Sequence, residues 1–187
     1  SNDRTRQRYK RRMTAPAILW FRRDLRLSDQ AALAVAAAAG PVIPVFILDD
    51  DTPKHRRMGA ACRWWLHHSL TSLDASLREK GSRLIVRRGK CEEQLANIAE
   101  EFGAGQVHCL RHYEPWWRNA EKAVAKRLDL QCHDGNYLLP PGSLTTGGGT
   151  PYKIYTPFWR ALKDHMPPAN PSNGPREIAA PARWPGS

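Results

Sequence analysis

The sequence predicts an α/β fold, a doubly wound parallel sheet of five strands with helices on both faces. Short apolar, β-branched runs alternate along the chain with longer segments of helical spacing, which is the signature of this class. The strand-like runs are almost continuously apolar, as strands buried on both faces are. The 187 residues are 41% hydrophobic and 25% charged, a composition typical of one globular domain.

The first elements are the most clearly marked. Residues 17–21 form a short apolar run and are expected to be the first buried strand. Ser28 or Asp29 offers an N-cap for a helix over residues 31–39, where alanine, the strongest helix former, dominates. Residues 42–48 are rich in β-branched side chains, which is typical of a central parallel strand.

The later elements continue the alternation. One face of a helix over residues 58–80 is marked by leucines spaced four, three and four residues apart, namely Leu66, Leu70, Leu73 and Leu77. Further elements are expected as strands at residues 84–86, 106–110 and 130–132, and as helices at residues 91–102 and 115–128. Right-handed crossovers turn this order into a Rossmann-like doubly wound sheet.

The pattern changes after Asn136, and four parts are expected. They are a basic disordered tail at residues 1–14, the α/β domain at 15–136, a turn-rich segment with a short helix at 137–166, and a proline-rich linker at 167–187. Thr156 would cap the short helix, with Pro157 at its first position. The last part holds six prolines in 21 residues, which predicts an extended interdomain linker outside any core, cut from a longer protein.

Charge, hydropathy and cysteine spacing exclude several classes. The net charge is +11, and the first twelve residues carry +5 of it, which leaves +6 for the folded part. That balance permits contact with a phosphate backbone. No apolar run approaches the ~20 residues of a membrane span, and no secretory signal opens the chain. The cysteines lack C-x-x-C spacing, which predicts reduced thiols in a cytoplasmic protein and no metal site; they are Cys62, Cys91, Cys109 and Cys132.

Residues 19–29, with the letters LWFRRDLRLSD, place charges where the first strand ends. Doubly wound sheets bind ligands at the carboxyl ends of their strands, so these side chains are candidates for a site. The alternative is a structural turn closed by local ion pairs, and for Asp24 we favour it. In that turn the acids Asp24 and Asp29 would neutralise the bases Arg22, Arg23 and Arg26.

Residues 111–118, with the letters RHYEPWWR, follow the fourth strand at the same edge. Trp116 or Trp117 could stack on a flat heteroaromatic ring. Neighbouring residues of a helix do not face the same way, so at most one of them would stack and the other would pack in the core. For the pair Trp64 and Trp65 we favour packing, because the leucine stripe continues beside them, and His67 and His68 would be surface residues.

Four ordered strings carry a family resemblance: LWFRRDLRLSD at residues 19–29, YEP at 113–115, LPPG at 139–142 and YKIYTPFWR at 152–160. Together they resemble the photolyase and cryptochrome family over residues 17–166. RWWLHHSL and PWW resemble its bacterial branch that repairs cyclobutane pyrimidine dimers. No G-x-G-x-x-G or P-loop motif competes with this assignment.

The resemblance implies the N-terminal light-harvesting domain of a flavin-dependent deoxyribodipyrimidine photolyase, a lyase that repairs ultraviolet-induced dimers in DNA. FAD would sit in a C-terminal helical domain beyond Ser187, so this chain alone is expected to be inactive. The expected partners are that FAD domain and damaged DNA, for a monomer without a membrane contact. The alternatives are a cryptochrome-type photoreceptor and a stand-alone α/β nucleotide-binding module.

The resemblance also implies an antenna chromophore in this domain, and we favour methenyl-tetrahydrofolate over a deazaflavin. The familiar folate set has Asn-Glu where this chain has Trp116 and Trp117, and deazaflavin members carry an acid where it has His112. The expected binding residues are Asp49, Asp50, His55, Arg111, His112, Glu114, Trp116 and Trp117. Glu114 is the nearest carboxylate to accept ring N–H donors. The alternative is that Tyr113 and Glu114 only cap the fourth helix.

Overall fold

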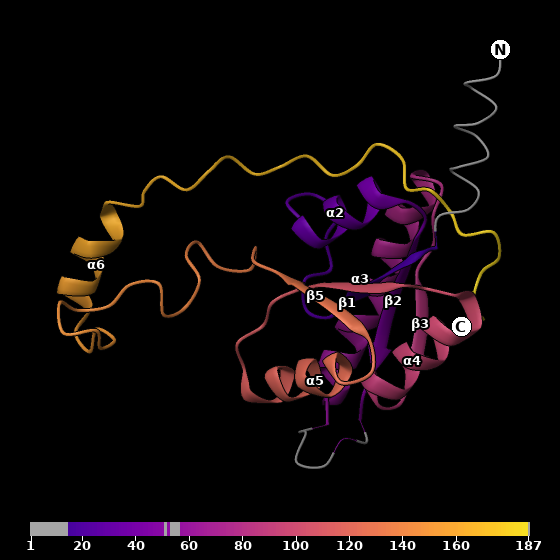
Figure 1. Cartoon of the computed structure of the whole chain (residues 1–187), viewed down its shortest axis with the longest axis horizontal. Helices are drawn as coiled ribbons and strands as arrows, with labels where there is room; N and C mark the ends of the chain where they lie inside the picture. The colour runs from indigo at the N-terminus through magenta and orange to yellow at the C-terminus, as the bar shows by residue number, and fades with distance from the viewer. Residues whose placement is uncertain (1–14, 51, 53–56, 187) are drawn as a thin grey trace.

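The computed structural model describes residues 15–50, 52 and 57–186. The basic tail expected at residues 1–14 and the candidate ligand His55 therefore lie outside the described residues. In the described chain, five parallel strands form one sheet in the order β3-β2-β1-β4-β5 (Figure 1). The predicted fold class is confirmed.

The helices and strands follow the predicted order closely. The strands are β1 (Ala17–Phe21), β2 (Val42–Leu48), β3 (Ile85–Arg88), β4 (Gln106–Leu110) and β5 (Asp129–His133). The helices are α2 (Ala31–Ala39), α3 (Ala60–Glu79), α4 (Cys91–Phe102), α5 (Pro115–Ala125) and α6 (Tyr155–Lys163).

Strand β1 lies at the centre of the sheet and is buried along its whole length. It pairs with β2 on one side, where Ala17 is opposite Val42, and with β4 on the other, where Ala17 is opposite Gln106. From β1 the chain adds β2 and β3 on one side of the sheet, and then β4 and β5 on the other side. The point where the order reverses lies between the carboxyl ends of β1 and β4, where doubly wound sheets bind ligands.

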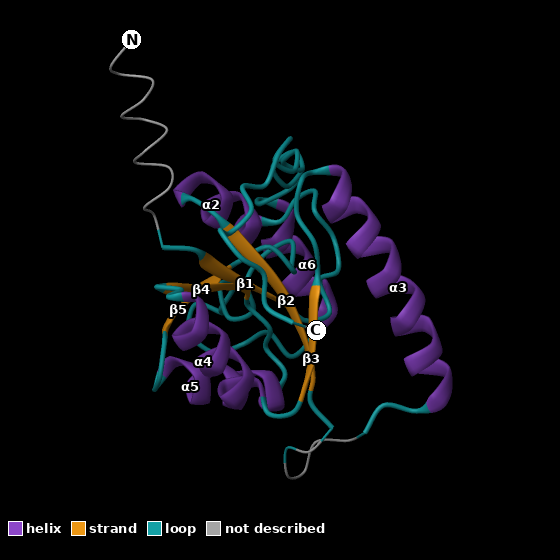
Figure 2. Cartoon of the chain, turned by 90° about the vertical axis from the view of Figure 1, so that its right-hand side faces the viewer, coloured by secondary structure: helices purple, strands orange, loops and turns teal. Residues whose placement is uncertain are grey.

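Two hydrophobic cores hold the helices against the sheet. On one face Leu33 of α2 and Leu77 of α3 are buried against Phe21. On the other face Leu95 of α4 and Val124 of α5 are buried in a cluster that includes strand β1. Figure 2 shows α3 on one side of the sheet and α4 with α5 on the other. The expected leucine stripe of α3 is confirmed, because Leu73 and Leu77 are buried and Leu66 and Leu70 pack on the same cluster.

The predicted caps are wrong for two helices. Gln30, and not Ser28 or Asp29, occupies the N-cap of α2. Asp29 is instead tied to the C-terminal segment, because its backbone N–H donates to the Ser172 carbonyl at 2.8 Å and its carboxylate accepts from Ser172 N–H. Helix α6 begins two residues early, with Ile154 as its N-cap, so the expected cap at residue 156 lies inside the first turn.

The proline-rich segment after α6 runs back across the domain, as Figure 1 shows in yellow. It is extended, but the expectation that it contributes to no core is wrong. Ile178 is 2% exposed and belongs to the cluster beneath α2 and α3. Its N–H donates to the Lys80 carbonyl at 2.9 Å, and the Val42 N–H donates to the Ala179 carbonyl. No helix in the described part of the chain is long and apolar enough to cross a membrane.

Candidate functional site

Arg22 is the first residue after β1 and its side chain is completely buried. Nη1 donates to Glu121 Oε1 of α5 at 2.8 Å, and Nη2 donates to the Leu110 carbonyl at the end of β4. The guanidinium also lies over the rings of Trp20 and Trp117, at 4.7 and 5.3 Å from their centroids. This arginine therefore joins β1, β4 and α5 at the point where the strand order reverses.

The expected local ion pairs of the first turn are wrong. Arg22 pairs with Glu121 and Arg23 pairs with Glu114. These partners are 99 and 91 residues away in sequence, and the fold brings them together at one edge of the sheet. Arg26 donates to the backbone carbonyls of Asp29 and Gly135 and so braces two loops. The sequence placed these charges at the correct edge, but no local spacing identified the two glutamates as their partners.

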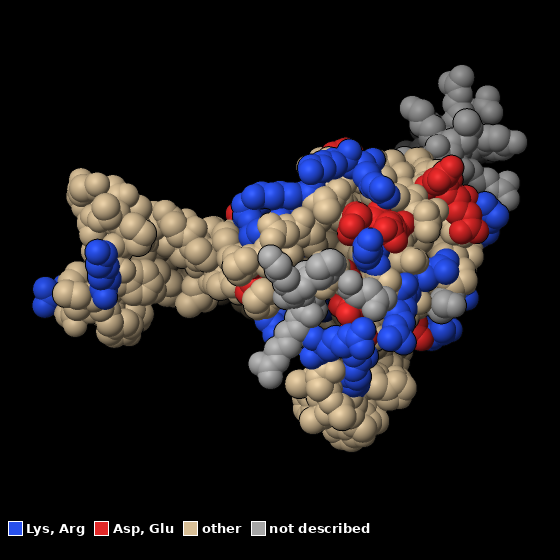
Figure 3. Space-filling model, turned by 90° about the horizontal axis from the view of Figure 1, so that it is seen from below, with Lys and Arg blue, Asp and Glu red and all other residues tan. Residues whose placement is uncertain are grey.

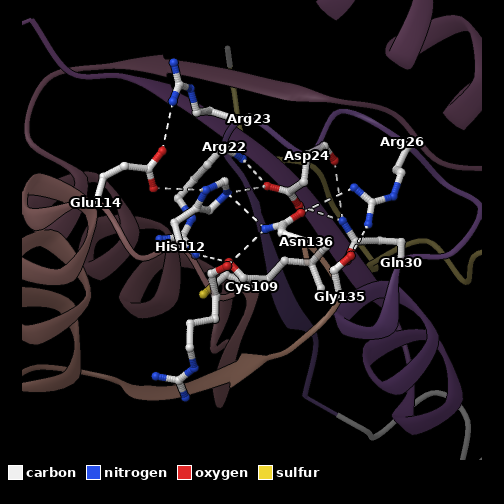
Figure 4. Close-up of polar contacts among 12 residues, drawn as sticks. Arg22, Arg23, Asp24, Arg26, Gln30, Cys109, His112, Glu114, Gly135 and Asn136 are labelled. Carbon is white, nitrogen blue, oxygen red and sulfur yellow. Dashed lines mark hydrogen bonds and ion pairs between the residues drawn. The ribbon is translucent and has the colours of Figure 1, made fainter. Parts of the chain in front are cut away.

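Asp24 is buried and forms a polar cluster that Figure 4 shows. Its carboxylate accepts hydrogen bonds from His112 Nε2 at 3.2 Å, Gln30 Nε2 at 2.7 Å and the Arg22 backbone N–H at 3.3 Å. Burial raises the pKa of Asp24, but the hydrogen bonds from His112 and Gln30 outweigh it and leave the pKa below its ordinary value. Asn136 Nδ2 lies 3.3 Å from the same His112 nitrogen. Asp24 is therefore part of a structural cluster, as we favoured, but His112 and Gln30 hold it in place of the expected arginine ion pairs.

Glu114 occupies the N-cap position of α5, with Pro115 in the first turn, but its side chain makes no capping hydrogen bond. Oε1 instead accepts from Arg23 Nη1 at 2.9 Å, and Oε2 lies 3.7 Å from His112 Nδ1. Burial raises the pKa of Glu114, while its own backbone N–H and Arg23 lower it more, so the pKa lies below the ordinary value. Oε2 is buried and accepts no hydrogen bond from any described residue. A ligand N–H donor would satisfy this oxygen.

The two tryptophans of α5 are separated by the helix, as helical geometry requires. Trp117 packs edge-on against Trp20, with ring centroids 6.2 Å apart, and against His112 at 5.8 Å. Trp116 is 45% exposed. Between the two, Trp116 has the face that a ligand could reach, and Trp117 belongs to the core.

The packing that we favoured for the tryptophans of α3 is wrong. Trp64 and Trp65 are 63% and 70% exposed and lie outside the leucine stripe of α3. His67 and His68 are exposed, as expected, and the His68 ring lies 4.5 Å from that of Trp64.

The remaining candidate residues do not all gather beside Glu114. Asp50 is buried and pairs with Arg63 at 2.7 Å and with Arg88 at 3.7 Å, which ties it to α3 and β3. Asp49 accepts a hydrogen bond from the Thr52 backbone N–H. The expected site therefore falls into one group near β2 and β3 and another at the junction of β1, β4 and α5.

Arg111 points toward β5, where Nε lies 3.8 Å from the Asp134 carboxylate. It borders a shallow depression of about 150 Å³, lined by Arg111, Tyr113, Asp134, Gly135, Asn136, Tyr137 and Pro140. That volume is below the ~300 Å³ at which ligand pockets begin. Sequence reasoning did not find Asn136 or Tyr137, which follow the last strand and carry no recognisable motif.

The structure also brings together residues that sequence spacing separated. The ligand atoms of Cys109, Glu121 and Cys132 lie within 4.8 Å of one another, and they are the described side chains that could hold a metal ion. Glu121 is already engaged by the buried guanidinium of Arg22. A cation here would meet that positive charge, which disfavours a metal centre.

The fold and the edge cluster together define a class: a doubly wound α/β domain with a polar, aromatic site where its strand order reverses. Comparison with known proteins identifies the family. The family model described as DNA photolyase matches residues 17–176. The chain belongs to the DNA photolyase family and corresponds to its N-terminal α/β domain.

Three relatives illustrate this membership. The chain is 42% identical over 180 residues to the deoxyribodipyrimidine photo-lyase of Agrobacterium fabrum, covering 93% of this chain and 37% of that protein. It is 34% identical over 169 residues to cryptochrome-1 of Arabidopsis thaliana, covering 87% of this chain and 25% of that protein. The crystal structure of a class III photolyase from Agrobacterium tumefaciens superposes with a TM-score of 0.85 at 42% identity, covering 93% and 37%. The chain thus spans little more than a third of the photolyases that it matches.

Proposed function

We propose that this chain is the light-harvesting domain of a flavin-dependent deoxyribodipyrimidine photolyase. Family membership and the 42% identity to a bacterial photolyase support this assignment. The observation that carries the antenna site is the buried oxygen of Glu114 that accepts no hydrogen bond, at the start of the same helix that exposes Trp116. Bound methenyl-tetrahydrofolate would absorb light and pass the excitation energy to a flavin held by a separate FAD domain.

Glu114 would bind the chromophore by accepting a ring N–H at Oε2, the oxygen that Arg23 leaves free. Trp116 would supply the stacking face, since it is the exposed member of its pair. His112 and Arg23 would keep Glu114 ionised and fix its orientation, because both lie within 4 Å of its carboxylate. A pterin, which carries N–H donors on a flat ring, fits this set.

The second group would serve a ligand that extends along the sheet edge. Near β2 and β3, Asp50 provides a negative charge and its partners Arg63 and Arg88 provide positive charges. Arg111 provides a further positive charge near β5, at the other end of this edge. Asp49 and His55 follow β2 in sequence, and we keep both as candidate ligands of this group. Trp117 would not contact the ligand, and its role would be to hold His112 in place by packing against it. These roles are secondary to that of Glu114.

The expected partners of the whole protein are its FAD domain and ultraviolet-damaged DNA, and we propose a monomeric, cytoplasmic protein. A cryptochrome-type photoreceptor is the second candidate, and the 34% identity to a plant cryptochrome favours keeping it. Light-driven loss of thymine dimers by the full-length protein would separate the two.

The test is titration of the chain with methenyl-tetrahydrofolate, followed by the fluorescence of the chromophore. Glu114→Ala and Trp116→Ala should each weaken binding by about tenfold or more, since each removes a charged hydrogen bond or a stacking face worth at least ~1.4 kcal/mol. Trp117→Ala should weaken it through loss of packing, visible as lowered thermal stability. Trp65→Ala, an exposed tryptophan on α3, is the matched control and should bind as the wild type does.

Equal binding by the wild type and by both site variants would show that the site lies elsewhere. A parallel titration with a deazaflavin distinguishes the chromophores. If neither compound binds, the assignment of this edge as an antenna site is wrong.

A further inference from the structure

Cys109 and Cys132 are 23 residues apart in sequence but directly opposite each other in the sheet. They are register partners on the parallel strands β4 and β5, so both side chains project from the same face. Their Sγ atoms are 3.6 Å apart. Neighbouring strands are ~4.8 Å apart, which lies within the Cα separation of about 4.4–6.8 Å that a disulfide accepts. A small side-chain rotation would therefore allow a bond.

The two thiols differ in access. Cys109 is fully buried in the core that α4 and α5 cover. Cys132 lies on β5, the edge strand, and is half-buried. A small solute can therefore reach Cys132 first, with Cys109 directly behind it. This is the arrangement of an attacking thiol and a resolving thiol.

The charges around the pair reinforce that division. The hydrogen bond from the Cys109 thiol lowers the pKa of Cys132, against the effect of its burial, and the cations Arg111 and Arg22 lower it further. The same hydrogen bond, together with burial, raises the pKa of Cys109. Deprotonation is therefore easier at Cys132 than at Cys109, and the thiolate is the reactive form. The buried Cys91, whose pKa burial raises to about 12, lacks such a partner thiol among the described cysteines.

We propose that Cys109 and Cys132 form a dithiol modification site that a hydroperoxide oxidises reversibly to an intramolecular disulfide. A disulfide is neutral, so it adds no charge beside the buried pair of Arg22 and Glu121, whereas a bound cation would. This thiol pair lies beneath α4 and α5, near the carboxyl ends of β4 and β5, and its oxidation needs no bound chromophore.

The reaction balances with one peroxide per disulfide. The Cys132 thiolate attacks one oxygen of the peroxide, the O–O bond breaks, and hydroxide leaves with the two electrons that sulfur gives up. Cys132 is then a sulfenic acid. The Cys109 sulfur attacks Cys132 Sγ, the S–S bond forms and the S–O bond breaks. The departing hydroxide takes the Cys109 proton and leaves as water. A dithiol such as dithiothreitol reverses the oxidation by thiol–disulfide exchange.

The test treats the reduced chain with hydrogen peroxide, removes the excess with catalase, alkylates in denaturant, and maps the cysteines by mass spectrometry. Cleavage after Glu101 and Glu121 places Cys109 alone on residues 102–121, which separates it from Cys91 and Cys132. We expect a fragment of residues 102–121 linked to the fragment that contains Cys132, a chain that stays monomeric on a non-reducing gel, and loss of the link on treatment with dithiothreitol.

Two variants assign the roles. Cys109→Ser should stop the reaction at the sulfenic acid, so that dimedone labels Cys132. Cys132→Ser should leave Cys109 fully alkylated after peroxide, because the buried thiol is not reached. Cys62→Ser removes the exposed cysteine and should leave the cross-link unchanged. The proposal is overturned if wild type keeps four free thiols, or if Cys132 is oxidised to a sulfinic acid without any link to Cys109.

Discussion

Arg22 has the most demanding environment of any described arginine, because its guanidinium has no exposure to water. Transferring one charged side chain from water into the protein interior costs several kcal/mol. For Arg22, the hydrogen bonds to Glu121 and to the Leu110 carbonyl offset this cost. Each terminal nitrogen donates a hydrogen bond and the guanidinium lies over two aromatic rings, while Nε has no partner among the described residues.

Breaking this pair from one side should be costly. Arg22→Met leaves the Glu121 carboxylate buried without its partner, so we expect the free energy of unfolding to fall by about 3–5 kcal/mol. The double variant Arg22→Met with Glu121→Leu should lose less than the sum of the two single changes, since no charge remains buried. Urea titrations of the four proteins measure this. Additive losses would show that the pair does not act as a unit.

A second prediction concerns the histidines His108 and His133 on the opposite face of β4 and β5. His108 Nδ1 lies 3.0 Å from His133 Nε2, with the rings stacked 5.2 Å apart. Burial lowers the pKa of each, and His133 lowers that of His108 further, from the ordinary 6.5. The nearby Asp129 and Asp134 oppose the shift without reversing it.

The sign follows from proton binding. Because the unfolded chain takes up protons near pH 6.5 and the folded pair resists them, stability is fully present above that pH and decreases as pH falls below it. We expect the urea midpoint to fall between pH 7 and pH 5. His108→Gln with His133→Gln should flatten that part of the profile, whereas His67→Gln, an exposed control, should not change it. A wild-type midpoint independent of pH in this range would contradict the prediction.

At the scale of elements, the sequence predicted most of the sheet. β1 and β2 have the expected bounds because a strand buried on both faces is an apolar run, which needs no long-range information. β4 also has the expected bounds, although Gln106 and His108 interrupt its apolar residues. The caps could not be predicted, since Asp29 is held by Ser172 across the fold. The prediction that Trp64 and Trp65 pack in the core failed for a simpler reason. They are next to the leucine stripe of α3 in sequence but do not share its helical spacing, so they point to solvent.

For the candidate site, the sequence predicted which residues lie at the same edge of the sheet, but not which of them pair. Parallel topology requires Arg22, Arg23 and Glu114 to come to one edge, and the sequence showed that. Which carboxylate pairs with which arginine depends on the packing of α5 against β1, which no local spacing encodes. Cys109 and Cys132 were separated by sequence and joined only by strand register.

The segment that follows α6 gives a test at this scale. Ile178 is the side chain by which it enters the core, so Ile178→Ala should lower the free energy of unfolding by about 2–5 kcal/mol. It should also make residues 167–186 more accessible to protease. Ile154→Ala removes the same side chain at a position that is 69% exposed, and should change stability by less than about 0.5 kcal/mol. Equal effects of the two changes would show that the segment is not docked in solution.

The whole molecule carries its positive charge in two different ways. Figure 3 shows Lys and Arg interspersed with Asp and Glu over the body of the domain, while the lobe that contains α6 is mostly uncharged. Such a mixed surface attracts a phosphate backbone weakly, because its anions cancel much of the field. The first twelve residues are different, with six basic residues against Asp3 alone.

We therefore expect weak binding of duplex DNA by this chain to depend mainly on residues 1–12. Deleting them removes +5 of the net charge of +11. If each of the five net charges lost contacts one phosphate, the slope of log affinity against log salt becomes shallower by up to about 4.5. Fluorescence anisotropy of a labelled duplex at several salt concentrations measures both proteins, and ultraviolet-irradiated DNA should bind no better than intact DNA. Tight binding that survives the deletion would make the folded surface the DNA-binding element, because only its net +6 would then remain to account for the affinity.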